Sequence, residues 1–302
     1  MPLLKGRINR RGSHVFFAGV GVVFGCVFGG YIIMGGNIMI ILKAAPFELL
    51  VILGAAIGAM IIGTPKHILP KVSQAFSELL KGPSYTKTTY LDLMCLLYQI
   101  FKLSQAKGML ALEPHVEKPE ESTLFAAFPS VKADHHVVEF ICDYLRMITM
   151  GTDNPHQIED IMNEEMEVHH HEKHQMASVF STMGDGLPAL GIVAAVLGVI
   201  KTMAAIDQPP AVLGKMIGGA LVGTFLGVFL AYGIVGPIGQ NLNALYEEEG
   251  KFYACIRTAI IAYLNGYAPA IAIEFARKTI PVHLRPSFYE VEAKVSELPA
   301  PS

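Results

Sequence analysis

The sequence has little charge for its length. Asp, Glu, Lys and Arg make up 16% of its 302 residues, whereas 52% of the residues are hydrophobic. The mean hydropathy of +0.44 is too high for an ordinary soluble domain of this size. The net charge of −3 leaves no general basic surface that would neutralise phosphates, which argues against nucleic-acid binding. The composition therefore indicates a membrane protein.

Paired cysteines and the usual motifs of enzyme active sites are also absent. The four cysteines are far apart and form no CxxC pair, so the sequence predicts isolated thiols in a reducing compartment and no zinc module. There is no GxSxG motif, no Walker loop and no GxGxxG between a strand and a helix. We therefore expect no enzymatic activity and no cofactor. The cysteines are Cys26, Cys95, Cys142 and Cys255.

A histidine cluster is the one pattern that suggests a metal. His170 and His174 would share a helical face at the spacing found in zinc sites, with His169 and His171 beside them. No glutamate stands in an HExxH frame, and a histidine-rich acidic helix at a membrane surface is usually just solvated. We therefore expect no bound metal, although stoichiometric zinc or iron in the purified protein would favour a membrane enzyme.

Four apolar stretches approach the length needed to cross a membrane. A hydrocarbon core of about 30 Å requires about 20 helical residues. Glu48 lies at the starting edge of the second stretch. The first is longer than the apolar core of a signal peptide and lacks a clear cleavage site, so we expect it to be retained. The stretches are 15–34, 47–63, 185–200 together with the uncharged segment 175–184, and 216–238.

Basic residues set the orientation of these spans. Four precede the first span, one lies in the first loop and two lie beside the third loop, which places both termini in the cytoplasm. The sequence predicts an all-α membrane protein with four transmembrane helices and a large helical cytoplasmic domain between the second and third spans. Its parts are a cytoplasmic N-terminus (1–14), spans one and two (15–63), the cytoplasmic helical domain (64–175), spans three and four (176–240), and a cytoplasmic C-terminal helix and tail (241–302).

The predicted cytoplasmic domain contains two amphipathic patterns. Apolar residues recur at helical spacing in both, which predicts helices with one buried face. Gly151 is a suitable stop for the second helix, and prolines punctuate the segment. The patterns are Leu93, Leu96, Leu97, Ile100 and Phe101, and Val137, Val138, Ile141, Leu145 and Ile148.

Small residues recur four apart on one face of each span. Gly219, Gly223 and Gly227 form such a stripe in the fourth. Because lipid tails are as apolar as leucine, spans associate through close backbone approach, which small residues permit. The stripes predict tight packing, within this chain or between copies, and hence an oligomer. The others are Gly21, Gly25 and Gly29, Gly54 and Gly58, and Gly191 with Ala195 and Ala194 with Gly198.

No ionisable residue lies well inside a predicted span, and two prolines do. An ion path through a membrane usually needs an ionisable group at depth, so a chain of this kind would take its carboxylate from another chain in a hetero-oligomer. Pro188 and Pro237 fall at similar depth in the third and fourth spans. Each removes a backbone N–H and frees a carbonyl. One proline is as readily plain helix punctuation, but the matched pair favours a functional hinge.

Three further segments are informative in combination: GDGLPALGIVAAVLGVIKTM from Gly184, LVGTFLGVFLAYGIVGPIG from Leu221 and LNGYAPAIAIEFARKTIPVHLRPSFYEVE from Leu264. Together they resemble the MotA/TolQ/ExbB proton channel family, and within it the MotA subunits of the flagellar stator. The resemblance extends from the first span to Glu292, and the combination of segments is specific although each glycine-rich piece alone is not. It implies a multi-pass protein of the bacterial inner membrane, in a ring of five such chains around two copies of MotB. MotB would supply one span with the ion-carrying aspartate.

The resemblance also implies roles for four residues in the spans. Pro188 and Pro237 match the paired prolines that govern the family's conformational response to ion passage. Thr224 matches a threonine that faces the ion path. Ala195 stands where sodium-driven relatives have a second threonine, which resembles the proton-driven branch. We therefore expect the transported ion to be H⁺.

The segment KLSQAKGMLALEPHVEKP from Lys102 resembles the family's contact region for the rotor protein FliG. Glu113 matches the acidic position of that region. The basic position departs from the pattern, because Gln105 aligns with it. The resemblance leaves open whether Lys102 or Lys107 supplies the positive charge or whether the contact is rearranged, and exposed ion pairs are weak enough to be redistributed.

Two further functions stay open at this point. An energiser of the ExbB or TolQ type also uses proton flow, but it normally has three spans and a different C-terminal tail. A passive structural membrane protein would be insensitive to protonophores. The four spans and the segment from NGYAP to RPSF favour the stator, whose genomic neighbour should encode one span followed by a peptidoglycan-binding domain. The expected partners are thus MotB, FliG, further copies of this chain and membrane lipid.

Overall fold

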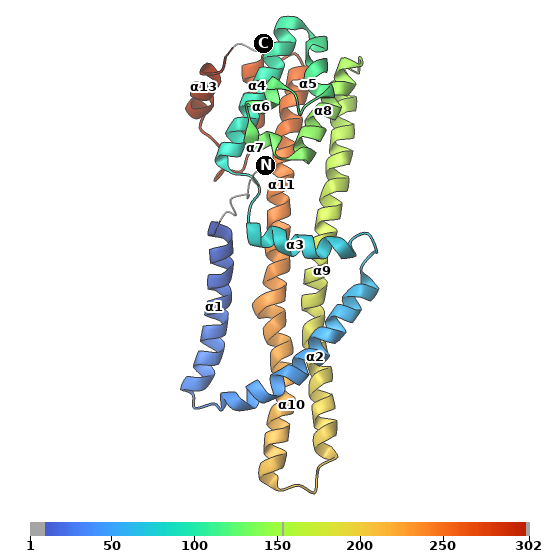
Figure 1. Ribbon diagram of the computed structural model, residues 1–302, viewed down its shortest axis with the longest axis vertical. Helices are drawn as coiled ribbons and strands as arrows, with labels where there is room; N and C mark the ends of the chain where they lie inside the picture. Colours follow the sequence, from blue (N-terminus) through green and yellow to red (C-terminus); the bar gives the residue numbers. More distant parts are fainter. Residues whose placement is uncertain (1–9, 153, 300–302) are drawn as a thin grey trace. The chain divides into compact units, whose positions relative to one another are not determined.

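The computed structural model describes residues 10–152 and 154–299. Within them every regular element is a helix, which confirms the predicted all-α class (Figure 1). The helices are α1 (Arg10–Ile33), α2 (Ile38–Gly63), α3 (Leu69–Lys81), α4 (Lys87–Lys107), α5 (Glu113–Glu117), α6 (Thr123–Ala126), α7 (Pro129–Lys132), α8 (His135–Thr149), α9 (Pro155–Met203), α10 (Pro210–Leu230), α11 (Gly236–Leu264), α12 (Pro269–Thr279) and α13 (Phe288–Ser296), with a 3-10 turn at Met109–Leu112 and a π-helical turn at Ala231–Val235.

Four helical stretches are long and apolar enough to cross a membrane. They are the part of α1 from His14 to Ile33, α2, α9 and the stretch that α10 forms with the π-helical turn and α11. A large helical region separates the second from the third. The structure thus confirms the predicted class of an all-α protein with four candidate spans and a helical domain between the second and third.

The second span begins earlier than the sequence analysis placed it. Helix α2 starts at Ile38 instead of residue 47, because Asn37 caps it: its side-chain oxygen accepts a hydrogen bond from the Met39 N–H at 3.1 Å. Pro46 lies inside the helix and does not end it. The apolar residues at 38–42 favour a helix. Lys43, Pro46 and Glu48 interrupt the apolar run after them, so the sequence pattern did not show that the helix is continuous. Glu48 is therefore inside a candidate span and not at its edge.

The third span is part of a much longer helix. Helix α9 runs for 49 residues without a break. At about 1.5 Å per residue it is about 74 Å long, of which only some 30 Å fits in a hydrocarbon core. The sequence analysis ended the cytoplasmic domain at residue 175 because polarity changes there. Helical structure continues through that change, since a solvated helical turn and a lipid-facing one have the same backbone hydrogen bonds.

The chain forms two compact units whose borders differ from the predicted ones. The first contains the described part of 1–82 together with 171–246, and the second contains 83–170 together with the described part of 247–302. Residues 64–82 thus join the spans, and the C-terminal segment joins the helical domain. Sequence order could not reveal this, because tertiary packing brings α11, α12 and α13 to α4.

The core of the second unit consists of large apolar side chains. The two amphipathic patterns are confirmed, since Leu93 and Ile141 are completely buried with their neighbours in both sets. The Tyr85 and Phe252 rings stack with centroids 3.8 Å apart. Each large side chain that is fully buried stabilises the fold by about 1.5–3 kcal/mol. Helix α8 ends at Thr149 and Gly151 follows with a φ of 101°, as the glycine stop predicted.

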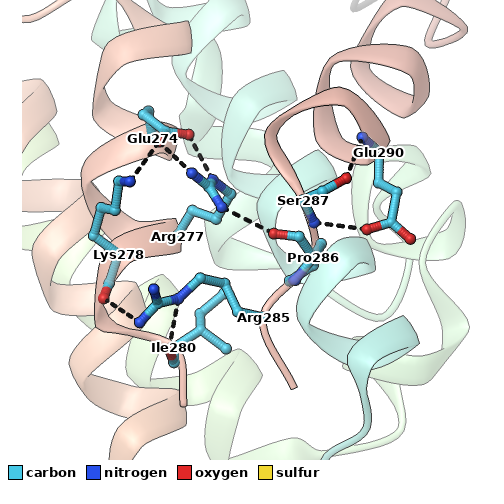
Figure 2. A network of polar contacts seen from close by, with 8 residues as sticks. All are labelled: Glu274, Arg277, Lys278, Ile280, Arg285, Pro286, Ser287 and Glu290. Atoms are coloured by element: carbon cyan, nitrogen blue, oxygen red, sulfur yellow. Dashed lines mark hydrogen bonds and ion pairs between the residues drawn. The ribbon is translucent and has the colours of Figure 1, made fainter. Parts of the chain in front are cut away.

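A polar network fixes the C-terminal helices of this unit (Figure 2). Arg277, only 8% exposed, donates to both oxygens of Glu274 at 2.6 and 2.7 Å, and to the Pro286 carbonyl at 3.0 Å. Ser287 then begins α13 in a reciprocal cap with Glu290. The Glu290 carboxylate also accepts a hydrogen bond from Lys87 at the start of α4 (2.7 Å). The network thereby ties the loop after α12 to α13, and α13 to α4.

In the first unit, helix α3 packs against α9 and α11. Ile68, Ala75 and Leu79 are buried in one cluster with residues of both long helices. The Glu78 carboxylate accepts a hydrogen bond from the Tyr246 hydroxyl at 3.0 Å and pairs with Lys173 at 3.3 Å. The amphipathic helix that follows the second span is therefore anchored to the third and fourth spans by both apolar and polar contacts.

Candidate ion path and coupling site

Helices α9 and α10 pack with their backbones in contact. A Cβ atom added at Gly227 would lie 2.7 Å from Gly191 Cα and 2.7 Å from the Leu187 carbonyl oxygen. One added at Gly191 would lie 2.8 Å from the Gly223 carbonyl oxygen. No side chain fits at these positions, so the backbones of α9 and α10 can come this close only because glycines stand there. The structure thus places Gly223 and Gly227 in the α9–α10 contact.

The other small-residue stripes have different surroundings. A Cβ added at Gly219 would make only an ordinary contact with Ala44 of α2, at 3.8 Å. The described structure has no neighbouring atom within 4 Å of a Cβ added at any glycine of the stripes in α1 and α2. These two stripes are therefore unpacked within the described chain, in contrast to those of α9 and α10.

Pro237 lies two residues after the end of the π-helical turn Ala231–Val235. The Gly236 N–H donates to the Ala231 carbonyl, five residues back, instead of four. Pro237 itself has no N–H to donate, and the residues before it adopt the wider turn. π-Helical turns are rare and often lie at functional sites, because they interrupt the regular ladder of hydrogen bonds. Sequence analysis found the proline, but no pattern in the sequence indicated the π turn.

Pro188 lies inside α9, opposite this irregular turn. A Cβ added at Gly184 would lie 3.2 Å from the Gly236 N atom, and Gly191 contacts Gly227. Pro188 is therefore level with the stretch between Gly227 and Gly236, whereas Pro237 lies close to the level of Gly184. The two prolines are about five residues, or about 7 Å, apart along the helices. Their depths are similar but not equal, which refines the predicted match.

Ala195 and Thr224 lie at the same helix contact. Ala195 is 9% exposed, and its N atom would be 3.0 Å from a Cβ added at Gly223. Thr224 follows Gly223 and is half-buried. The structure thus places Ala195 at the contact of α9 with α10, and Thr224 next in the chain to a glycine of that contact.

Glu48 is the functional candidate that sequence analysis missed. Its Oε2 atom would lie 2.6 Å from a Cβ added at Gly223, and its Oε1 atom 3.8 Å from one added at Gly198. The carboxylate of α2 therefore reaches the contact between α9 and α10. Charged groups inside spans are costly and usually functional. The expectation that Glu48 lies at the edge of its span was wrong, because α2 begins at Ile38, ten residues before it.

The residues of the predicted rotor contact lie in the second unit. Lys102, Gln105 and Lys107 are exposed in the last two turns of α4, and Glu113 is the exposed first residue of α5. Gly108, with a φ of 84°, ends α4 between them. The structure places all four on solvent-accessible positions at one helix junction.

A groove of about 550 Å³ lies beside Glu113. His115 in this groove is within 2.9 Å of the Ser122 hydroxyl. Partial burial, with a further contribution from the positive charge of Lys107, lowers the pKa of His115 below its ordinary value. The lining carries three glutamates and one lysine, namely Glu113, Glu117, Glu121 and Lys118. Glu121 pairs with Lys118 at 3.6 Å and Glu117 pairs with Arg146 at 2.7 Å.

The histidine cluster and the cysteines lie on helices. Among residues 10–152 and 154–299 no three His, Cys, Asp or Glu side chains are grouped so as to hold a metal ion. His171 contacts the Gln175 side chain at 2.9 Å. The cysteines are free thiols, as predicted. Burial raises the pKa of Cys142 to about 12, so this thiol stays protonated.

Comparison with known proteins identifies the family. The family described as "Motility protein A N-terminal" matches residues 17–108, and the MotA/TolQ/ExbB proton channel family matches 132–253. Motility protein A of Salmonella typhimurium is 43% identical over 93% of this chain and 95% of its own length. The chain belongs to the motility protein A family. A further relative of this motility protein A family member is chemotaxis protein LafT of Vibrio parahaemolyticus, 35% identical over 93% of this chain and 98% of its own.

Solved structures share the fold of this motility protein A family member. The structure of C. jejuni MotAB matches with a TM-score of 0.73 at 21% identity, over 89% of this chain and 96% of that one. The flagellar MotAB stator complex from Bacillus subtilis matches with a TM-score of 0.69 at 26% identity, over 85% and 92%. The resemblance stated from the sequence is thereby confirmed, and the chain is a multi-pass membrane protein.

Proposed function

We propose that this protein is a stator subunit of the bacterial flagellar motor that converts proton flow into torque on the rotor. The observation that carries the proposal is the 43% identity to motility protein A over nearly the whole chain. The proposed location is the inner membrane, with both termini in the cytoplasm, as the distribution of basic residues favours. A role as a channel subunit, without enzymatic activity, accounts for the absence of enzyme motifs from the sequence.

The proposed partner is a single-span subunit of the MotB type that carries an ion-binding aspartate. Glu48 shows that a carboxylate within this chain also reaches the helix contact, so the lack of intramembrane charge no longer argues for a partner. Support comes from the two similar solved structures, both of which are MotAB assemblies. The glycine stripes of α1 and α2, unpacked in the described chain, are consistent with further copies in a ring of five.

In the proposed mechanism, protonation of the partner's aspartate changes the packing at Pro188 and Pro237. Both prolines interrupt backbone hydrogen bonding, and the π-helical turn provides a second irregularity at the same contact. Helix α9 extends from Pro188 back to Pro155, so it connects the proline along the chain to the second unit. The cytoplasmic helices would then move against the rotor.

The proposed ion is H⁺. Ala195 provides no hydroxyl oxygen at the α9 side of the contact, and only Thr224 offers one at the α10 side. A partly dehydrated sodium ion needs several oxygen ligands, whereas a proton needs one acceptor. Replacing Ala195 with Thr therefore adds an oxygen that the proton path does not use.

The proposed contact with the rotor protein FliG uses the junction of α4 and α5. Glu113 supplies the acidic group, and Lys102 or Lys107 supplies the basic group, because Gln105 cannot. The exposed carboxylate of Glu113 at the edge of the groove would accept a basic side chain of the rotor.

The test is motility after deletion of the gene in its own strain, with flagella counted in the same cells. Intact but paralysed filaments, restored by a plasmid copy, support the proposal. Pro188→Ala and Pro237→Ala should abolish rotation while membrane assembly persists, whereas Pro46→Ala in α2 is a matched control that should swim. Normal swimming of both α9 and α11 variants would overturn the hinge.

One alternative is examined in the same strain. The MotA/TolQ/ExbB family also contains energisers of outer-membrane processes. If the deletion leaves swimming intact but impairs outer-membrane uptake, the energiser function replaces the stator function. If both are intact in a strain with no second stator set, neither function holds.

A further inference from the structure

A basic groove opens where α2, α9 and α10 come together. It has a volume of about 420 Å³, and its polar lining comes from three helices: Asn37, Lys43, Glu48, Lys201, Thr202 and Lys215. Lys201 lies in the last turn of α9, and Lys215 lies in the second turn of α10. Lys201 and Lys215 directly flank the apolar stretches 185–200 and 216–238. Lysines at the ends of apolar spans are expected at the membrane interface, where the lipid headgroups lie.

The three lysines of the groove lack acidic partners. None forms an ion pair within 4.0 Å of a carboxylate among the described residues. Glu48 is the one acidic residue of the lining, and its carboxylate is directed at Gly223 and Gly198. Three like charges that share one groove repel each other, so an anion placed there would relieve an unfavourable interaction.

The groove continues into an exposed apolar surface on α2. Met39 and Phe47 line the groove and are 51% and 74% exposed. Leu42 and Leu50 are also exposed, and their spacing places them on the same side of α2. A ligand that fits both parts has a compact anionic group next to a long hydrocarbon chain.

We propose that this groove binds an anionic phospholipid, with the phosphodiester between Lys43, Lys201 and Lys215. Lysine binds phosphate as a point charge, and the side-chain NH₂ of Asn37 adds a donor at the rim, because only its oxygen is used in the cap of α2. Thr202 is buried in the wall, where its hydroxyl donates to the Gly198 carbonyl. One acyl chain lies along Met39, Leu42, Phe47 and Leu50. Such a lipid would hold α2 against the ends of α9 and α10. The proposal does not depend on the stator function.

Native mass spectrometry of the full-length protein in detergent measures this binding directly. Phosphatidylglycerol should remain bound where phosphatidylcholine, with its zwitterionic headgroup, does not. The variant Lys43→Gln/Lys201→Gln/Lys215→Gln should bind phosphatidylglycerol on the order of 100-fold more weakly, since each lysine near an anionic surface contributes a factor of about five. The variant with Arg at the same three positions should retain phosphatidylglycerol binding. That result would show that the triple Gln variant loses affinity because it loses positive charge.

The matched control is Lys118→Gln/Lys251→Gln/Lys294→Gln. It changes the net charge equally, at exposed positions of the second unit. This control should bind phosphatidylglycerol like the original protein.

Equal loss of phosphatidylglycerol binding in both triple variants, or no preference for phosphatidylglycerol over phosphatidylcholine, would overturn the proposal. If inorganic phosphate protects against thermal unfolding as well as the lipid does, the groove is a plain anion site and the acyl-chain contact is wrong. Displacement of the lipid by an acidic peptide but not by excess phosphate would reassign the groove to a protein partner.

Discussion

Within each of the two units, helices pack against one another in a different way. In the unit of the spans, α9 and α10 meet where side chains are missing, and glycine backbones touch at Gly191 and Gly227. In the second unit, α4 and α11 meet through large side chains, such as the stacked Phe101 and Tyr263 rings at 4.4 Å. In water, burial of apolar area drives packing, whereas between lipid-facing helices the close fit of backbones must do so. Loss of side-chain volume should therefore be most damaging in the second unit, and gain of side-chain volume in the first.

The largest effect is expected from Phe252→Ala in the second unit. Phe252 is fully buried and contacts both Tyr85 and Tyr90. Its loss leaves a cavity and should lower the free energy of unfolding by about 3–5 kcal/mol. Thermal unfolding of the purified protein measures this, and Phe288→Ala is the control, because Phe288 is 48% exposed. An equal effect of the two substitutions would remove the distinction between core and surface.

The reverse change, from small to larger, should disrupt the first unit. Gly227→Ala places a Cβ atom 2.7 Å from backbone atoms of α9, which cannot move aside separately. We expect a loss of about 3 kcal/mol from overpacking and loss of swimming. Gly214→Ala on the same helix has open space around it and should be neutral or slightly stabilising. Swimming assays and thermal unfolding compare the two, and a harmless Gly227→Ala would show that the helices do not need backbone contact.

A third test concerns the polar network of the second unit. Arg277→Ala removes the donor to Glu274 and to the Pro286 carbonyl. The Pro286 carbonyl then loses this donor, and Glu274 retains only the longer pair with Lys278 at 3.7 Å. The loss should cost about 2 kcal/mol. Arg285, which donates to the Ile280 and Lys278 carbonyls from a more exposed position, is the matched control. If Arg285→Ala lowered the midpoint of thermal unfolding as much as Arg277→Ala does, burial would not explain the difference.

The smallest effect is a pH dependence at the start of α13. The Lys87 ammonium and the Ser287 N–H hold the pKa of Glu290 at about 2, below its ordinary value of 4.5. A carboxyl group whose pKa is lowered by folding stabilises the protein above pH 4.5, and this contribution is lost as the pH falls from 4.5 towards 2. Glu290→Gln should therefore reduce the fall in unfolding temperature over that interval. An unchanged pH profile would show that the exposed pair is not formed in solution.

The spacing of apolar residues predicted the helices correctly where a whole helix lies in one environment, either water or lipid. The apolar sets of α4 and α8 are buried as predicted, and four candidate spans are present. The errors occurred at changes of environment. Glu48 was placed at a span edge because Pro46 and Lys43 interrupt the apolar run, although the helix tolerates both. The sequence showed the small-residue stripes, but it did not show which of them pack against another helix of the same chain.

The sequence by itself determined the helical class, the four spans, the family and the candidate residues at Pro188 and Pro237. It did so because helix periodicity, apolar length and proline chemistry are local properties. Only the tertiary structure decided that Glu48 reaches Gly223, that a π-helical turn precedes Pro237, and that the C-terminal helices complete the core around α4. Each of these depends on contacts between residues far apart in the chain or on a backbone irregularity, and neither leaves a periodic signal in the sequence.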